Sequence, residues 1–382
     1  MVENRSIATP RWQDYVLTQG KGFSDFWSSH LQHSRDILFV LGSGFDPRMC
    51  LGLDVFMNAG GLGHRHILTI AFEEGPLPPS PVQLALAAQN RAELQRLVPP
   101  GILTERCIPL WSEDKRRRVG ASHAVKIFKT VKDVIGYSDL VVDISALPRG
   151  IYFPLIAKIL YILDGARSKG TPHLPNLHVV VSEDPELDWH IRDEGVEDAA
   201  EYLTNFQGGA AIQGDNTLPM VWIPLLGEGQ QAQLERIADL VGSAEVCPVL
   251  PSPSRDPRRG DNLVLEYQNF LFDQLQIEPG NIIFASEWNP FEVYRQIRKT
   301  IFHYHSALAP LGGCKSVLSA LSTKLMSLGV LLVAYELKQT SVGVAVAHVE
   351  SRGYTVVGEP IQTPYVGSKL YGLWLWGECY EP

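Results

Sequence analysis

The sequence has little of what marks a zinc-binding, disulfide-bonded or membrane-spanning chain. Its five cysteines are scattered over 382 residues without a CxxC pair or a Cys/His ligand spacing, so neither a zinc site nor a disulfide framework is indicated. The longest apolar runs, such as residues 330–334, are far too short to cross a bilayer, and residues 1–15 lack the apolar core of a signal peptide. We therefore expect a cytoplasmic protein with no metal, no cofactor and no membrane association.

Positive charge and enzyme motifs are scarce as well. Lys and Arg number 33 against 42 Asp and Glu, which gives a net charge of −9 and argues against general binding to nucleic acid or to anionic membranes. The sequence contains no GxSxG elbow, Walker A loop, HExxH or GxGxxG motif. Without a recognisable catalytic motif, a binding protein is favoured over an enzyme.

What the sequence does contain is a regular alternation of strand and helix patterns. With 45% hydrophobic and 20% charged residues it has the composition of an ordinary globular protein. The alternation predicts an α/β fold with two Rossmann-like three-layer halves and mainly parallel sheets. We expect a short aromatic N-terminal arm at 1–35, a first domain at 36–250, a Pro/Arg-rich linker at 251–260 and a smaller second domain at 261–382.

Two loops of the first domain are predicted to follow the carboxyl ends of strands, where open α/β sheets bind ligands. The first is the turn Gly42–Arg48 and the second runs from Asp143 to Gly150. Arg48 and Arg149 would converge there on an anion such as phosphate, because a guanidinium binds phosphate in a bidentate manner. Alternatively, Asp46 pairs with Arg48 and Asp143 with Arg149, so that these residues only cap helices and stabilise the fold.

The second domain repeats this arrangement. A predicted strand at 281–286 runs into Glu287-Trp-Asn289-Pro at the start of a helix, and Ser319-Ala-Leu321 resembles Ser145-Ala-Leu147 of the first domain. These parallels suggest two related halves. The strand pattern at 370–376 is expected to close the sheet of the second domain; alternatively, its two tryptophans form an exposed interaction surface.

A local family resemblance involves the end of the second domain. Residues 321–325 and the following Gly329-Val-Leu-Leu, together with the apolar run 342–349 and Tyr354, resemble the closing helix and strand of CARF-like, Rossmann-type nucleotide-sensing domains of prokaryotic defence proteins. In those domains a Ser/Thr-Lys pair at a helix start faces the ligand phosphates. The resemblance, which is confined to this stretch, implies that role for Ser322, Thr323 and Lys324.

Three hypotheses about function follow. The first is a cytosolic binding or sensor protein for a phosphate-bearing small molecule, most plausibly a nucleotide, in an antiviral defence system. The second is an enzyme acting on a nucleotide or nucleoside, a hydrolase or transferase, with Asp46 or Asp143 as general acid or base. The third is a scaffold subunit of a protein complex or homo-oligomer. The candidate ligand-binding residues are Gly42, Ser43, Gly44, Asp46, Arg48, Ser145, Arg149, Glu287, Asn289, Ser322, Thr323 and Lys324.

Overall fold

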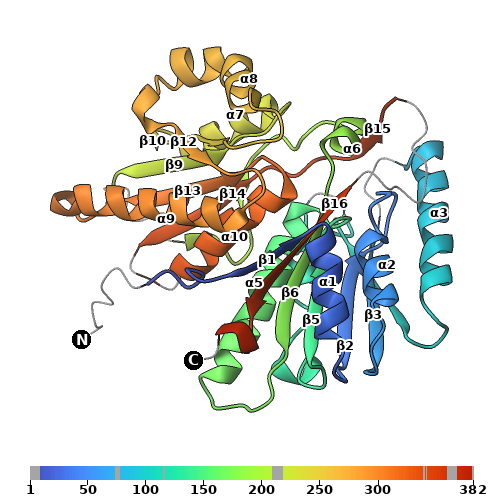
Figure 1. The fold of residues 1–382 in the computed structure, drawn as a ribbon. Coiled ribbons are helices and arrows are strands. Elements are labelled where there is room, and N and C mark those ends of the chain that lie inside the picture. Colours follow the sequence, from blue (N-terminus) through green and yellow to red (C-terminus); the bar gives the residue numbers. More distant parts are fainter. Residues whose placement is uncertain are drawn as a thin grey trace. The chain divides into compact units, whose positions relative to one another are not determined.

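The chain folds into two compact units, which differ from the predicted domains. The computed structural model describes residues 9–73, 78–114, 117–208, 218–338, 340, 342–358 and 368–380. Unit 1 consists of Met1–Tyr15 and Val196–Glu350, and unit 2 of Val16–Gly195 and Ser351–Pro382 (Figure 1). The predicted linker at 251–260 is therefore not where the chain divides. Its first residue already belongs to the sheet of unit 1, since Pro251 pairs with Ala285.

Unit 2 contains a seven-stranded sheet in which five neighbouring strands are parallel. In space these strands follow the order β4, β3, β2, β5, β6, which is the order 3-2-1-4-5 of a Rossmann fold when counted along the chain. Strands β2 and β5 are buried at every position, as expected for parallel strands covered on both faces. The strands are β1 (Val16–Gln19), β2 (Ile37–Gly42), β3 (Arg65–Glu73), β4 (Leu103–Pro109), β5 (Asp139–Asp143), β6 (Asn176–Glu183) and β16 (Lys369–Trp376).

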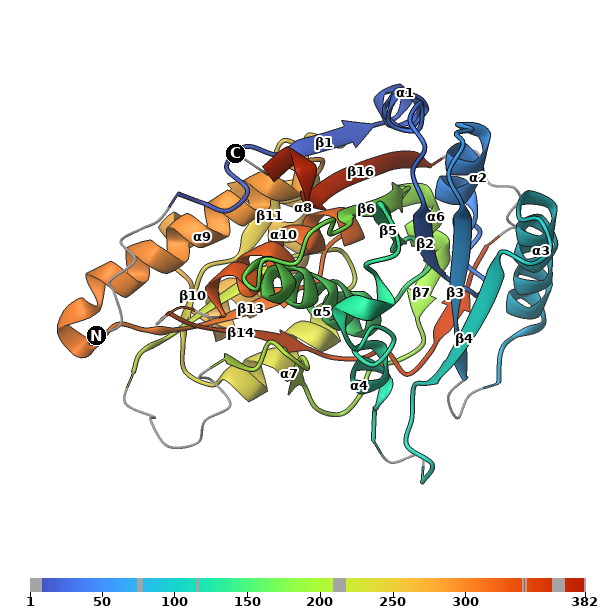
Figure 2. The same cartoon turned by 90° about the horizontal axis from the view of Figure 1, so that it is seen from below.

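Helices cover both faces of this sheet. Three helices pack their apolar side chains against one face, and α5 lies on the other face with the short helix α4 beside it (Figures 1 and 2). Two short strands, β7 (Ile191–Asp193) and β15 (Tyr354–Val356), form a separate antiparallel ribbon. The helices are α1 (Lys21–His30), α2 (Leu51–Asn58), α3 (Pro81–Leu97), α4 (Gly120–Ala124), α5 (Arg149–Arg167) and α6 (Pro185–His190).

Unit 1 is built on the same plan. Five of its parallel strands follow the order β12, β11, β9, β13, β14, which is again 3-2-1-4-5. The short strand β10 pairs parallel with β9, and β8 pairs antiparallel with β14. Both units thus have the predicted Rossmann-like α/β architecture. The strands are β8 (Glu201–Tyr202), β9 (Met220–Leu225), β10 (Glu245–Val246), β11 (Val249–Pro251), β12 (Ile283–Ala285), β13 (Lys315–Ala320) and β14 (Gly343–His348).

The helices of unit 1 complete its three layers. Leu234, Ile237 and Leu263, which belong to the first two helices, pack into one apolar cluster with Trp222 of β9. The other two helices pack against each other, and α10 is buried along almost its whole length. The helices are α7 (Gln231–Val241), α8 (Arg259–Glu266), α9 (Pro290–Ala307) and α10 (Lys324–Leu337).

The two ends of the chain differ from the expectations. The residues expected to form one arm are divided. Trp12 meets the ring of Tyr294 edge to face and Tyr15 stacks on Phe291, both in unit 1, whereas β1 and α1 belong to unit 2. Strand β16 does not close the sheet of the second predicted domain. It lies between β1 and β6 in unit 2, where antiparallel pairing on both sides removes it from the sheet edge. Trp376 is accordingly buried.

Candidate functional site

The switch point of unit 2, where the order of the strands reverses, lies between β2 and β5. The chain continues from β2 to β3 on one side and from β5 to β6 on the other, so the two loops diverge at the carboxyl ends of these strands. The loops are in close contact, because a Cβ atom built on Gly42 would lie 2.6 Å from the carbonyl oxygen of Ala146. The structure therefore brings the two predicted loops together and places Arg48 and Arg149 at the same edge of the sheet.

Arg48 lies inside the protein and is bound by two carboxylates. Its Nε and Nη2 donate to Asp46 at 2.9 and 2.8 Å, and its Nη1 donates to Asp188 of α6 at 2.6 Å. The side chain is only 4% exposed. Burial alone would lower the pKa of Arg48, but the two carboxylates raise it well above the ordinary value. This is the alternative arrangement, in which Asp46 pairs with Arg48, and it joins the loop to α6.

Asp143 is also covered by the protein. It is 1% exposed, and its Oδ1 accepts a hydrogen bond from the backbone N–H of Ser145 at 2.9 Å. A Cβ atom on Gly52 would lie 2.4 Å from Asp143 Oδ2, so α2 packs directly on this carboxylate. Ser145 in turn accepts a hydrogen bond from the Ser182 N–H at 2.9 Å. The geometry gives neither Asp143 nor Asp46 the open surroundings that a general acid or base requires.

The remaining residues of these loops have mixed surroundings. Ser43 and Gly44 are partly buried, and the Ser43 N–H donates to the carbonyl of Ile70 at 2.8 Å. Arg149 is partly buried and is the first residue of α5. A cation in the first turn is unusual, because the helix dipole favours negative charge there.

The switch point of unit 1, between β9 and β13, has a matching glycine. A Cβ atom on Gly227 would lie 2.3 Å from the carbonyl oxygen of Leu321. The loop after β13 continues from Leu321 through the buried Ser322 to Thr323. The Thr323 side chain caps α10 by accepting from the Met326 N–H at 3.3 Å. Lys324 is the first residue of α10 and has the same position as Arg149 in α5.

Glu287 and Asn289 lie in the loop after β12 of unit 1. Arg259 donates to Glu287 at 2.6 Å through Nη1 and to Glu228 at 2.6 and 2.7 Å through Nε and Nη2. Glu228 follows Gly227, so these ion pairs link the loops after β9, β11 and β12. Asn289 caps α9 by accepting from the N–H groups of Phe291 and Glu292.

The sequence comparison of the two halves needs one correction. Ser145 lies two residues after the end of β5, and Ser322 lies two residues after the end of β13. By position in the fold, Ser145 therefore corresponds to Ser322 and not to Ser319, which is inside β13. Strand β13 was not predicted, and neither Arg259 nor Glu228 was among the candidate ligand-binding residues. Gly227, two residues after the end of β9, was a signal in the sequence that could have marked this loop.

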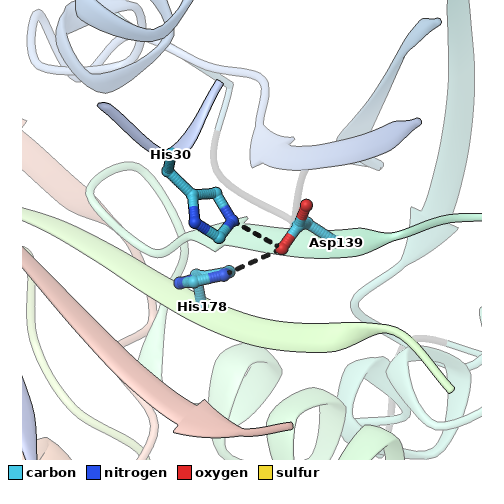
Figure 3. A group of neighbouring side chains, drawn as sticks. All are labelled: His30, Asp139 and His178. Atoms are coloured by element: carbon cyan, nitrogen blue, oxygen red, sulfur yellow. Dashed lines mark hydrogen bonds and ion pairs between the residues drawn. The ribbon is translucent and has the colours of Figure 1, made fainter. Parts of the chain in front are cut away.

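A third group of polar residues lies at the opposite, amino end of the unit 2 sheet, where no ligand site was expected. Figure 3 shows His30 of α1 and His178 of β6 turning one ring nitrogen each toward Asp139, the first residue of β5. The distances from the two Nε2 atoms to Asp139 Oδ1 are 3.0 and 3.2 Å. The three ligand atoms lie within 4.8 Å of one another. The sequence could not predict this group, because its three residues lie more than 30 positions apart along the chain.

The same carboxylate has two further partners. Arg35 Nε donates to Asp139 Oδ2 at 2.6 Å, and Asn176 Nδ2 donates to Oδ1 at 2.9 Å. Burial alone would raise the pKa of Asp139, but the hydrogen bonds from His178, His30 and Arg35 lower it far below the ordinary range. Burial lowers the pKa of His178, so this imidazole is neutral near pH 7. Asp139 is therefore a buried, ionised carboxylate between two imidazoles.

Comparisons with known proteins give no family for this chain. No family model and no curated protein matches it. One matching solved structure, from Pseudomonas aeruginosa UCBPP-PA14, is described as that of a universal stress protein. It is 14% identical, with a TM-score of 0.23, and the match covers 83% of this chain and 94% of the other. So low a TM-score supports no argument about the site. Among the described residues, no helix is long and apolar enough to cross a membrane.

Proposed function

We propose that this chain is a cytosolic binding or sensor protein for a phosphate-bearing small molecule, most plausibly a nucleotide. The observation that carries the proposal is the basic residue at the start of the helix after the fourth strand, Arg149 in unit 2 and Lys324 in unit 1. A cation at that position opposes the helix dipole, whereas a phosphate bound there interacts favourably with both the cation and the helix N-terminus.

Of the two switch points, that of unit 1 is the better phosphate site on electrostatic grounds. In unit 2 three carboxylates, those of Asp46, Asp143 and Asp188, lie in or beside the two loops, against Arg48 and Arg149. A phosphate would be repelled by this excess of negative charge. In unit 1 Glu228 and Glu287 are both paired with Arg259, and the adjoining loop adds Lys324. We therefore assign the first phosphate contact to Ser322, Thr323 and Lys324.

The other two hypotheses gain less support. Catalysis by Asp46 or Asp143 requires an accessible carboxylate, but Asp46 is paired with Arg48 and Asp143 is covered by α2. A scaffold docking through its terminal aromatics requires them at the surface, but Trp12 and Trp376 are buried. A role in antiviral defence depends on the CARF-like resemblance of residues 321–354 and is part of the proposal only in that sense.

The proposal is tested by measuring the affinity of the purified chain for mononucleotides, dinucleotides and cyclic oligonucleotides by calorimetry. Lys324→Gln should weaken binding by about 1.5–3 kcal/mol, the range for a hydrogen bond to a charged group, or roughly 10- to 150-fold. Lys338→Gln is the matched control, because Lys338 lies at the other end of the same helix. Arg149→Gln tests the switch point of unit 2 in the same way.

Two results would contradict the proposal. One is that no nucleotide of the panel binds the intact chain. The other is that a nucleotide binds both Lys324→Gln and Arg149→Gln as tightly as it binds the natural chain. Chromatography of the nucleotide after incubation decides between sensor and enzyme, because turnover that Asp143→Asn abolishes without loss of affinity would establish the enzyme.

A further inference from the structure

We propose that His30, Asp139 and His178 form a binding site for one divalent first-row transition metal ion, with Zn²⁺ as the representative ion. The site lies at the amino end of the unit 2 sheet and is independent of the nucleotide proposal, which concerns the carboxyl ends of the strands. Two imidazoles and one carboxylate are ligand types that suit Zn²⁺ and its neighbours and disfavour Mg²⁺ and Ca²⁺, which prefer oxygen ligands alone.

Two of the three separations between ligand atoms are close to those around such an ion, and the third, between the two imidazole nitrogens, is at most 4.8 Å. Ligand atoms lie about 2.0–2.2 Å from Zn²⁺, so donors in tetrahedral geometry lie about 3.4 Å from one another. The two Nε2 atoms lie 3.0 and 3.2 Å from Asp139 Oδ1. Opening these two contacts by a few tenths of an ångström, and bringing the two imidazole nitrogens to a similar separation, would accommodate the ion. Three protein ligands leave a fourth position for water, the arrangement of open zinc sites.

The hydrogen bonds around Asp139 also favour an ion. Its Oδ1 is approached by four donors, namely the Nε2 atoms of His30 and His178, Asn176 Nδ2 at 2.9 Å and Arg35 Nη2 at 3.4 Å. One carboxylate oxygen has only about two lone-pair sites, so these donors compete. An ion bound to both imidazoles would replace two of the four donors by one bond and leave Oδ1 to the ion, Asn176 and the longer contact from Arg35 Nη2.

The partners of Asp139 beyond the ligands are those that a metal site needs. Arg35 Nε holds Oδ2 at 2.6 Å and thereby fixes the orientation of the carboxylate, as hydrogen bonds to ligating carboxylates do in metal sites. Its positive charge opposes the ion, but Arg35 also pairs with Glu378 at 2.8 Å, so its charge is shared between two carboxylates.

The surroundings of His178 are mostly apolar. A small pocket is lined by this residue together with Phe26, Trp27, Val16, Thr18, Gly372 and Leu373. The aromatic rings of Phe26, Trp27 and Trp374 pack around both imidazoles and hold them in place. The ring centroids of Phe26 and His30, which are stacked, lie 5.1 Å apart, and those of Trp374 and His178 lie 4.8 Å apart. Rigid ligands of this kind lower the cost of assembling a metal site.

The test uses glutamine variants of the two histidines in the full chain. The glutamine amide reaches about as far as Nε2 and can donate to Asp139, so a purely structural hydrogen-bond network survives in His30→Gln and His178→Gln, whereas transition-metal binding does not. His66→Gln is the matched control, because His66 lies in the same unit and bonds to Tyr137 and Thr104 instead.

After removal of metal by a chelator, Zn²⁺ is titrated by calorimetry and bound zinc is counted by mass spectrometry. We expect one Zn²⁺ per chain in the natural protein and in His66→Gln. In both ligand variants the affinity should fall by more than about 100-fold, beyond the 10- to 100-fold effect of losing a partner outside the ligand set. Zn²⁺ should also raise the melting temperature of the natural chain and of His66→Gln, but not that of the two ligand variants.

Replacement of Zn²⁺ by Co²⁺ keeps the proposal testable if a variant does not fold. The natural chain should then show the visible absorption bands of four-coordinate Co²⁺, with X-ray absorption indicating two imidazole ligands. Two results would overturn the proposal and leave Asp139 as the centre of a structural network. One is that the natural chain binds no ion, and the other is that His30→Gln and His178→Gln bind Zn²⁺ as tightly as the natural chain.

Discussion

Gly227 lies so close to Leu321 that a Cβ atom built on the glycine would stand 2.3 Å from the leucine carbonyl oxygen. Gly42 has the same relationship to Ala146 in unit 2, at 2.6 Å. The loop after β2 therefore touches the backbone of the loop after β5, and the loop after β9 touches that of the loop after β13. This shared contact, together with the common strand order, is a more specific sign of two related halves than any sequence similarity between them.

Gly227→Ala should destabilise unit 1, because the added methyl group must displace backbone atoms and not the end of a flexible side chain. We expect a loss of about 1–3 kcal/mol in the free energy of unfolding, the usual cost of overpacking, measured by urea denaturation. Gly280→Ala is the control, since a Cβ atom there meets nothing within 4 Å. Equal stability of the two variants would show that the loops can separate freely.

Arg48→Ala should leave Asp46 and Asp188 without their common cation. Breaking a buried ion pair from one side costs about 3–5 kcal/mol, and we expect the lower end because Asp188 is partly hydrated. Arg96→Ala should change the free energy of unfolding little, because Arg96 pairs with Glu93 and Asp54 at the surface. A small effect at Arg48 in urea denaturation would contradict the assignment of this arginine to the fold.

The ion pair of Glu228 and Arg259 predicts a specific dependence on pH. Burial alone would raise the pKa of Glu228, but its bonds to Arg259 outweigh this, and the pKa is lowered. The pair therefore contributes stability above the unfolded-state pKa of about 4.3, and this contribution is lost as the pH falls through the folded-state value. The difference in unfolding free energy between the natural chain and Glu228→Gln should be under about 1 kcal/mol at pH 7, because Glu228 is partly exposed. It should shrink toward pH 3, and a difference that grew on acidification would be inconsistent with the ion pair.

Truncation distinguishes the observed position of β16 from the predicted one. A chain that ends at residue 367 loses Tyr371, Leu373, Leu375 and Trp376, all of which are buried in unit 2. Hydrogen exchange should therefore show lost protection in β1 and β6, with β9 and β13 retained. A chain that ends at Tyr380 serves as the control. Loss of protection confined to β9 and β13 would favour the original prediction that this strand closes the other sheet.

The sequence by itself determined the α/β class and the loops at the carboxyl ends of the strands. Strand β2 is a continuous apolar run that ends in small residues, because burial on both faces requires a local pattern that can be read directly. Strand β13 (Lys315-Ser-Val-Leu-Ser-Ala320) was missed, since lysine and two serines interrupt its apolar pattern although every position is buried.

Only the tertiary structure decided which strands share a sheet and which side chains meet. The chain leaves unit 2 after Gly195 and returns to it at Ser351, and no local pattern reports such a return because pairing between distant strands depends on the whole fold. Arg48 was correctly placed in its loop, but its burial depends on Asp188, 140 residues away. His30, Asp139 and His178 are polar residues in separate elements, and only strand order and the docking of α1 bring them together.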